Sequence, residues 1–170
     1  MTSHPDNLCL SPAWTVSPVR YDAPSVQPLL LQLHLAQVQM YGFADDPADT
    51  PADDYTPPNG LFLLGRDASG QAAGCGGWRL LDPRTAEIKR MYVRPDARGK
   101  SLGREILRRL EADAQLHEIT HVQLETGVAN LAALSLYRSH GYQPIKPYRP
   151  GRNPAVNRAL HKTLQGTLAP

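Results

Sequence analysis

The chain has 170 residues, of which 41% are hydrophobic and 20% are charged, a composition typical of one globular domain with a substantial core. Its net charge is only +2, it has no run of about 18 apolar residues, and its N-terminus lacks a basic-then-apolar leader. Membrane insertion and secretion are therefore not indicated, and a cytoplasmic location is expected. Two cysteines far apart and six histidines without ligand spacing predict neither a disulfide framework nor a metal site.

Hydrophobic periodicity divides the first part of the chain into elements. Residues 1–12 hold proline and polar residues without a period and are expected to be a flexible lead-in to one domain over residues 13–166. Residues 14–20 favour a strand, and the apolar spacing of residues 26–41 predicts a helix that ends at Gly42.

The remaining elements follow an acidic stretch. Residues 43–60 contain five Asp and four Pro with little hydrophobic content, which indicates a surface loop. Strands are expected at 61–64, 72–81, 85–93, 121–126, 142–145 and 156–164, and helices at 101–118 and 131–140. This order predicts an α/β (α+β) fold, a mixed sheet with helices on both faces.

The segment between the third of these strands and the next helix has the features of an anion-binding loop. A helix that begins near Ser101 directs its free N–H groups back into the loop, where Arg98 and Lys100 add positive charge. Gly99 and Gly103 let the backbone approach a ligand without an intervening Cβ. These features predict a ligand that carries a pyrophosphate.

Two motifs carry a family resemblance. Residues 98–103, Arg-Gly-Lys-Ser-Leu-Gly, resemble the acyl-CoA loop of the GNAT superfamily of N-acetyltransferases, whose pattern is Arg or Gln, two residues, Gly, one residue, then Gly or Ala. Ser101 replaces the first glycine of that pattern, and whether it alters the affinity for CoA is left open. Residues 130–142 resemble the second signature of the family, which is Asn, a short helix, Leu-Tyr, then Gly and an aromatic residue.

The resemblance covers about residues 71–142, with a fainter likeness over 26–41 and 155–164. It implies a mostly antiparallel sheet of about six or seven strands. It also implies acetyl-CoA as acyl donor, bound without a metal, and direct transfer of the acetyl group to a primary amine in a ternary complex. The donor-binding residues implied are Met91, Tyr92, Val93, Arg98, Gly99, Lys100, Ser101, Leu102, Gly103 and Asn130.

The resemblance implies two catalytic residues. Glu87 stands four residues before Met91, the position of the general base in many members, and Tyr137 matches the tyrosine that protonates the departing thiolate. Each has a structural alternative: Glu87 could pair with Lys89 or Arg90, and the Tyr137 ring could simply pack in the core. Strict alternation along the strand places Glu87, Lys89, Met91 and Val93 on one face.

Charge is distributed unevenly along the chain. Residues 1–80 carry eight Asp and three Arg, whereas residues 81–170 carry fifteen Lys or Arg and eight Asp or Glu. The basic residues lack interleaved aromatic residues, so CoA is favoured over a nucleic-acid partner. The acidic loop favours a cationic amine as acceptor, with Tyr41 or Tyr55 offering a ring to the cation. A non-catalytic acyl-CoA sensor is the alternative function, and a homodimer is one option for the assembly.

Overall fold

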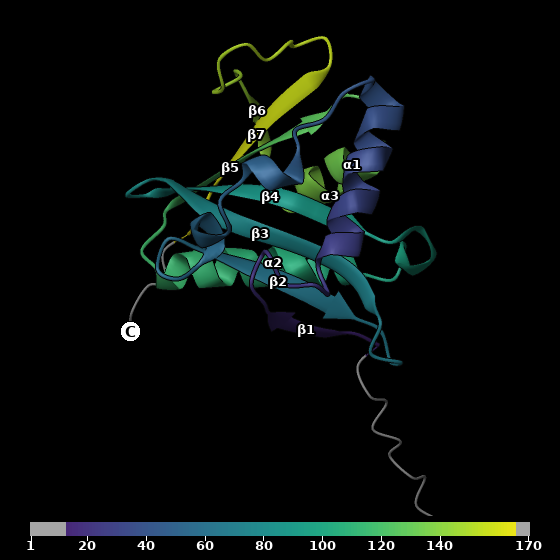
Figure 1. Cartoon of the computed structure of the whole chain (residues 1–170). Coiled ribbons are helices and arrows are strands. Elements are labelled where there is room, and N and C mark those ends of the chain that lie inside the picture. Colours follow the sequence, from purple (N-terminus) through teal and green to yellow (C-terminus); the bar gives the residue numbers. More distant parts are fainter. Residues whose placement is uncertain (1–12, 166–170) are drawn as a thin grey trace, which may run out of the picture.

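The computed structural model describes residues 13–165, which form one seven-stranded sheet with helices on both faces (Figure 1). The strands are β1 (Thr15–Pro18), β2 (Gly60–Arg66), β3 (Ala72–Asp82), β4 (Thr85–Val93), β5 (His121–Gly127), β6 (Gln143–Ile145) and β7 (Asn157–Thr163). The α-helices are α1 (Gln27–Tyr41), α2 (Leu102–Leu116) and α3 (Leu131–Ser139), and short 3-10 turns lie at Pro47–Asp49, Ala52–Tyr55 and Pro95–Ala97. The expected lead-in over residues 1–12 lies outside the described residues.

The sheet runs in the order β1-β2-β3-β4-β5-β7-β6, and every neighbouring pair is antiparallel except β4 with β5. This arrangement confirms the predicted mixed, mostly antiparallel sheet. The sequence signals at element ends also act as expected: α1 stops at Gly42, whose φ of 78° is left-handed and whose N–H donates to the Val38 carbonyl at 2.8 Å.

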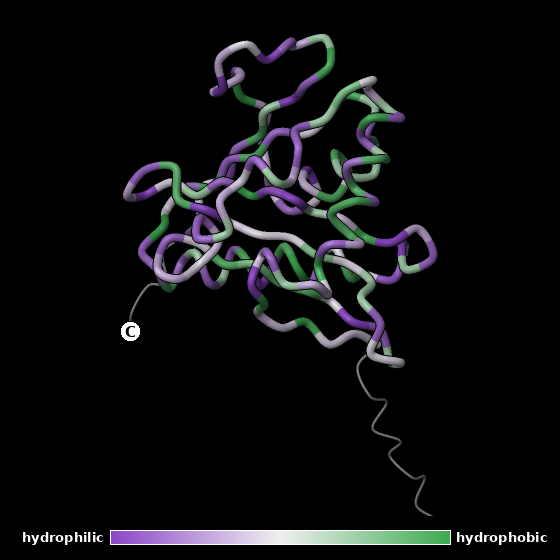
Figure 2. Tube along the Cα trace, viewed as in Figure 1, coloured by the Kyte–Doolittle hydropathy of each residue, from purple (hydrophilic) through white to green (hydrophobic). Residues whose placement is uncertain are grey.

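The sheet separates two hydrophobic cores. One face packs on α2 and α3 through residues such as Trp78, Ile106 and Tyr142, and the other face packs on α1 through residues such as Leu30 and Phe62. In Figure 2 hydrophobic and hydrophilic residues alternate along the helices, as expected for helices with one face on a core. No helix within residues 13–165 is long and apolar enough to cross a membrane.

Glycines let β3 sit tightly between these layers. A Cβ at Gly76 would lie 2.3 Å from the Met91 sulfur, and a Cβ at Gly77 would lie 2.6 Å from the Phe62 ring. Real Cβ atoms do not approach neighbours so closely, so both positions require glycine for packing.

One expectation about β4 is wrong. One residue of β3 lies between Cys75 and Gly77, whereas two residues of β4 lie between their partners Tyr92 and Lys89, so β4 contains a one-residue bulge. Arg90 occupies it with a left-handed φ of 59°. The bulge reverses the alternation, so Glu87 and Lys89 do not share a face with Met91 and Val93, which pack against the α2 core instead.

Candidate active site

The parallel neighbours β4 and β5 separate near the centre of the sheet. Their pairing covers only Thr85–Glu87 against His121–Gln123, and the later part of β4 has no ladder to β5. We call this opening the seam. Backbone N–H and C=O groups of Met91, Tyr92 and Val93 on the β5 side can therefore pair with an extended ligand.

The loop of residues 98–103 lies between the end of β4 and the start of α2. Gly99 and Ser101 are both left-handed, with φ of 72° and 67°. Lys100 accepts a hydrogen bond from Trp14 Nε1 through its carbonyl at 2.8 Å, and Arg98 Nε donates to the Val93 carbonyl at 2.9 Å. Both contacts hold the loop against the sheet.

The start of α2 has N–H groups available for an anion. The first backbone return bond of this helix runs from Glu105 N to the Ser101 carbonyl at 3.0 Å, as expected for a helix whose first N–H groups have no partner within the helix. Leu102 anchors the turn because its side chain is buried in the α2 core. Gly103 has room for a Cβ, which would meet Leu136 and Val93 at an ordinary van der Waals distance of 3.6 Å.

Ser101 has a strained left-handed backbone, and within residues 13–165 no hydrogen bond of its side chain at the helix start compensates for that strain. Among the described residues its hydroxyl caps nothing at the helix start, and its Cβ disfavours the left-handed backbone. Ser101→Gly should raise the free energy of unfolding by about 0.5–1 kcal/mol, because part of the relief is offset by the greater freedom of glycine in the unfolded chain. Chemical denaturation would measure this change.

Gly99 offers the matched control. It has a similar φ of 72°, and a Cβ there would meet nothing within 4 Å, so Gly99→Ser tests the backbone conformation alone. That substitution should destabilise the protein by a similar amount. A destabilising Ser101→Gly would contradict the strain argument.

Asn130 and Tyr137 are placed by α3. Asn130 is the N-cap of this helix, and its side chain accepts from Ala133 N at 3.2 Å. Tyr137 is 5% exposed and packs edge-on against Tyr142, with ring centroids 5.6 Å apart. Burial raises the pKa of Tyr137 above its ordinary value, which keeps its hydroxyl protonated at neutral pH.

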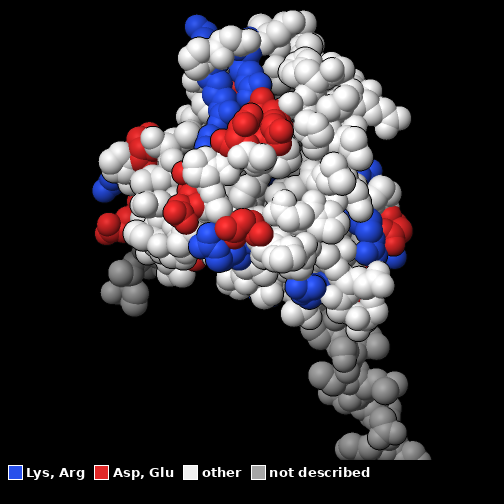
Figure 3. All heavy atoms as spheres, viewed as in Figure 1, with Lys and Arg blue, Asp and Glu red and all other residues white. Residues whose placement is uncertain are grey.

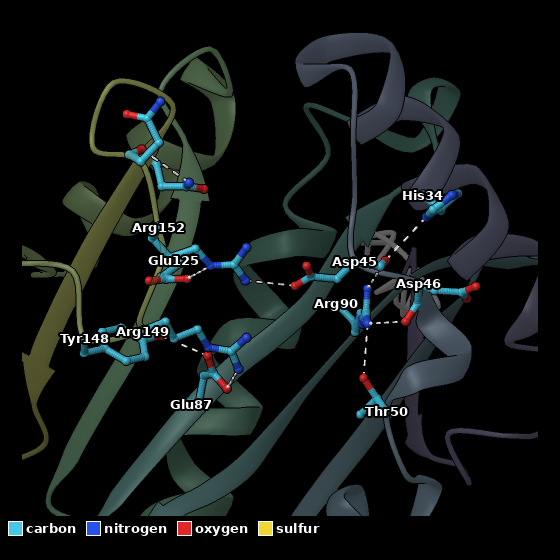
Figure 4. Close-up of polar contacts among 12 residues, drawn as sticks. His34, Asp45, Asp46, Thr50, Glu87, Arg90, Glu125, Tyr148, Arg149 and Arg152 are labelled. Carbon is cyan, nitrogen blue, oxygen red and sulfur yellow. Dashed lines mark hydrogen bonds and ion pairs between the residues drawn. The ribbon is translucent and has the colours of Figure 1, made fainter.

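Glu87 is the centre of a buried ionic network (Figure 4). Its Oε2 accepts from Arg79 Nε at 2.9 Å and from Arg149 Nη2 at 2.8 Å, and its Oε1 accepts from Tyr148 Oη at 3.0 Å. Burial favours the neutral carboxyl, but Lys89, Arg149 and Arg79 together hold the pKa of Glu87 below its ordinary value. The ion pairs that form involve Arg79 and Arg149, not the expected Lys89 or Arg90.

A polar cavity of about 560 Å³ opens on this face of β4. It is lined mostly by charged residues, which come from β3, β4, the loop after α1 and the loop before β7: Asp45, Asp46, Asp49, Thr50, Arg79, Lys89, Arg90, Arg149, Pro150 and Arg152. In Figure 3 the side chains of Lys and Arg adjoin a patch of Asp and Glu on this part of the surface. We call this the charged cavity.

Known proteins share the sequence pattern and the fold of this chain. A sequence model of the acetyltransferase (GNAT) family matches residues 29–142, about two thirds of the chain. The chain belongs to the GNAT family. An uncharacterised N-acetyltransferase of Schizosaccharomyces pombe is 33% identical over 138 residues, which cover 76% of this chain and 80% of that protein. An IAA acetyltransferase of Azospirillum brasilense is 38% identical over 97 residues, which cover 55% of this chain and 63% of that protein.

Solved GNAT structures have the same fold. A Klebsiella pneumoniae protein assigned to the acyl-CoA N-acyltransferases superposes with a TM-score of 0.77 at 28% identity, over 89% of this chain and 98% of that one. A GNAT acetyltransferase of Elizabethkingia anophelis, solved with acetyl-CoA bound, has a TM-score of 0.63 at 17% identity, over 91% of this chain and all of that one. The predicted superfamily is confirmed, and the chain is an acyltransferase of the N-acetyltransferase type.

In this GNAT protein, residues in and around the charged cavity were missed by sequence reasoning. Tyr148, Arg149 and Arg152 come from the loop before β7. Tyr148 and Arg149 reach Glu87 on β4 across the seam, and Arg152 binds Glu125 on β5. In the sequence these residues form only a cluster of basic and aromatic residues in a Pro- and Gly-containing loop. Such a cluster does not indicate that Tyr148 and Arg149 contact Glu87, which lies 61 and 62 residues away.

Glu125 on β5 is a further carboxylate near the cavity, next to Arg152. Its Oε2 accepts from Arg152 Nε at 3.0 Å, and its Oε1 is buried without a partner among residues 13–165. Burial raises the pKa of Glu125, although Arg152 and Arg149 oppose the rise.

Some carboxylates of the acidic loop form ion pairs within the protein. Asp45 pairs with Arg152 at 2.9 Å, and Asp54 pairs with Arg79 at 2.9 Å, so these two carboxylates are already neutralised. Tyr55 cannot offer its ring to a cationic acceptor, because it is 2% exposed and packs against Phe62. No group of three or more metal-ligating His, Cys, Asp or Glu side chains occurs in the part of the chain that the structure describes.

Proposed function

We propose that the protein transfers an acetyl group from acetyl-CoA to a primary amine by direct attack in a ternary complex. The observation that carries this proposal is the seam between β4 and β5, which lies beside an anion-binding loop on one side and the charged cavity on the other. A donor and an acceptor could thus meet at the same stretch of β4.

The chain offers fitting groups for each part of the donor. The N–H groups at Gly99–Gly103, with Arg98 and Lys100, would hold the pyrophosphate, and the edge of β4 over residues 91–93 would hold the pantetheine arm. Asn130 would fix the far end of that arm beside α3. The N–H of Met91 would stabilise the negative charge that develops on the thioester oxygen, a contribution of about 3 kcal/mol.

Glu87 would take up the ammonium proton, directly or through water. A carboxylate has about four acceptor positions, of which the network fills three, so one position on Oε1 is available. Because its pKa is lowered, Glu87 would be ionised throughout the neutral range.

Tyr137 would return a proton to the departing thiolate, since burial keeps its hydroxyl protonated. Tyr137→Phe should lower kcat about tenfold or more, with less effect if water substitutes as the acid. The ring and its packing against Tyr142 remain in this variant, so its melting temperature should change little. Steady-state kinetics measure this effect. If kcat is unchanged in Tyr137→Phe, the role of Tyr137 is structural only.

A titration calorimetry experiment with acetyl-CoA, followed by a CoA-release assay over a panel of amines, tests the proposed function. Binding together with amine-dependent release supports the enzyme. Binding without release from any amine supports a non-catalytic acyl-CoA sensor, and the absence of binding contradicts both.

A further inference from the structure

Two cations on the α1 face of β4 lack a carboxylate partner. Within residues 13–165, Arg79, Arg149 and Arg152 each form salt bridges, but neither Lys89 nor Arg90 has a carboxylate oxygen within 4.0 Å. Both of them line the charged cavity. The cavity therefore contains positive charge that the protein itself does not balance by contact.

Arg90 is the more buried of the two. It is 8% exposed, and its guanidinium donates only to uncharged oxygens, namely the carbonyls of Asp45 and Asp46 and the hydroxyl of Thr50, at 3.1–3.4 Å. Its Nε is buried without a partner among the described residues. A buried charge is costly unless an opposite charge lies near it, so this site favours an incoming anion.

Lys89 lies one residue before Arg90 and is half-buried. Burial is the main reason that its pKa falls to about 8, and Arg149, Arg79 and Arg90 lower it further, whereas Glu87 opposes the fall. Glu87, the carboxylate that opposes the fall, is already paired with Arg79 and Arg149. An additional anion at this place would form charge-assisted hydrogen bonds and relieve the repulsion.

We propose that the acceptor amine carries a carboxylate that binds at Lys89, flanked by Arg149 and Arg90. This proposal rests on the proposed acetyl transfer and adds an anionic group to the expected cationic amine. The charged cavity also contains Asp46 and Asp49, so it presents both signs of charge, as a zwitterionic amino acid requires. Asp45 is already paired with Arg152 and contributes less to an incoming cation.

The test compares L-amino acids with their carboxamides, which keep the amine and lose the negative charge. In the CoA-release assay the parent should favour the acids at least tenfold in kcat/KM. Lys89→Met, which removes the charge and keeps the length, should lose this preference, and Lys89→Arg should retain much of it. Lys146→Met, the same change at an exposed lysine, is the matched control and should behave like the parent.

Acetyl-CoA binding should stay the same in all four proteins. A best acceptor without an anionic group, or an acid-to-amide ratio that Lys89→Met does not alter, overturns the proposal. Phosphoethanolamine as the best acceptor would also overturn it, in favour of a phosphate.

If no amino acid is acetylated, a binding measurement tests the carboxylate site at Lys89 directly. With CoA present, the acids should raise the melting temperature of the parent more than their amides do, and Lys89→Met should abolish the difference. No difference in the parent overturns the carboxylate site. Loss of acetyl-CoA binding, measured separately, would instead contradict the proposed function.

Discussion

Gly103→Glu should abolish the stabilisation of the protein by acetyl-CoA and leave the unliganded fold intact. A side chain has room at this position, because a Cβ meets its nearest neighbours at 3.6 Å, and a carboxylate is electrostatically compatible with a helix N-terminus. The same carboxylate would compete for the N–H groups that the pyrophosphate needs and would repel it. At a hundred times its dissociation constant the ligand should add about 2.7 kcal/mol of stability to the parent and none to the variant.

Thermal melts with and without acetyl-CoA measure this effect, which corresponds to roughly 5–10 °C for a domain of this size. Gly103→Gln, which has almost the same shape without the charge, separates repulsion from bulk and should retain more of the shift. A full shift in Gly103→Glu would remove residues 98–103 from the donor site.

Glu87→Gln should lower kcat about a hundredfold or more and leave acetyl-CoA affinity nearly unchanged, because a positioned base contributes to the chemical step and not to donor binding. The variant keeps the shape of the side chain but leaves Arg79 and Arg149 facing a neutral amide. Loss of one partner from a buried ionic network is expected to destabilise the fold by about 3 kcal/mol or more.

Tyr148→Phe is the control for this prediction. It removes one hydrogen bond from Oε1 and keeps the carboxylate, so it should affect kcat much less than Glu87→Gln. Glu87→Gln with normal turnover and reduced stability would make Glu87 a structural anchor, and the proton acceptor would have to be sought among the residues that line the charged cavity.

The free energy of unfolding should depend on pH in acid because Glu87 becomes protonated there. Its pKa is lower in the folded protein than in the unfolded chain, where it is about 4.3. Its contribution to the free energy of unfolding is therefore fully present above pH 4.3 and is lost as the pH falls through the lowered value. The stability difference between the parent and Glu87→Gln should accordingly shrink in acid, as denaturation at several pH values would show.

Local signals in the sequence predicted most of the fold. The apolar spacing that ends at Gly42 defined α1, and the loop of residues 98–103 was placed correctly at the start of α2. These features depend on residues close together in the chain, whose periodicity and turn preferences can be read directly.

The acceptor side could not be predicted in this way. Glu87 meets Tyr148 and Arg149 across 61 and 62 residues of sequence, and nothing in their local sequence indicates which charges become neighbours. The orientation of β4 side chains was also missed, because Arg90 gives no sign that it occupies a bulge with a positive φ. Such a conformation is usually marked by glycine or asparagine.

The bulge at Arg90 makes the length of β4 as important to the site as its composition. Removal of one residue there would restore a regular ladder with β3 and turn Met91, Tyr92 and Val93 over to the opposite faces of the sheet. The Tyr92 ring would then leave the α1 core and collide with the packing beneath α2. Chimeras between this chain and its relatives should therefore exchange residues 85–93 as a single block. A deletion or insertion of one residue inside this strand would place the side chains after it on the wrong faces of the sheet.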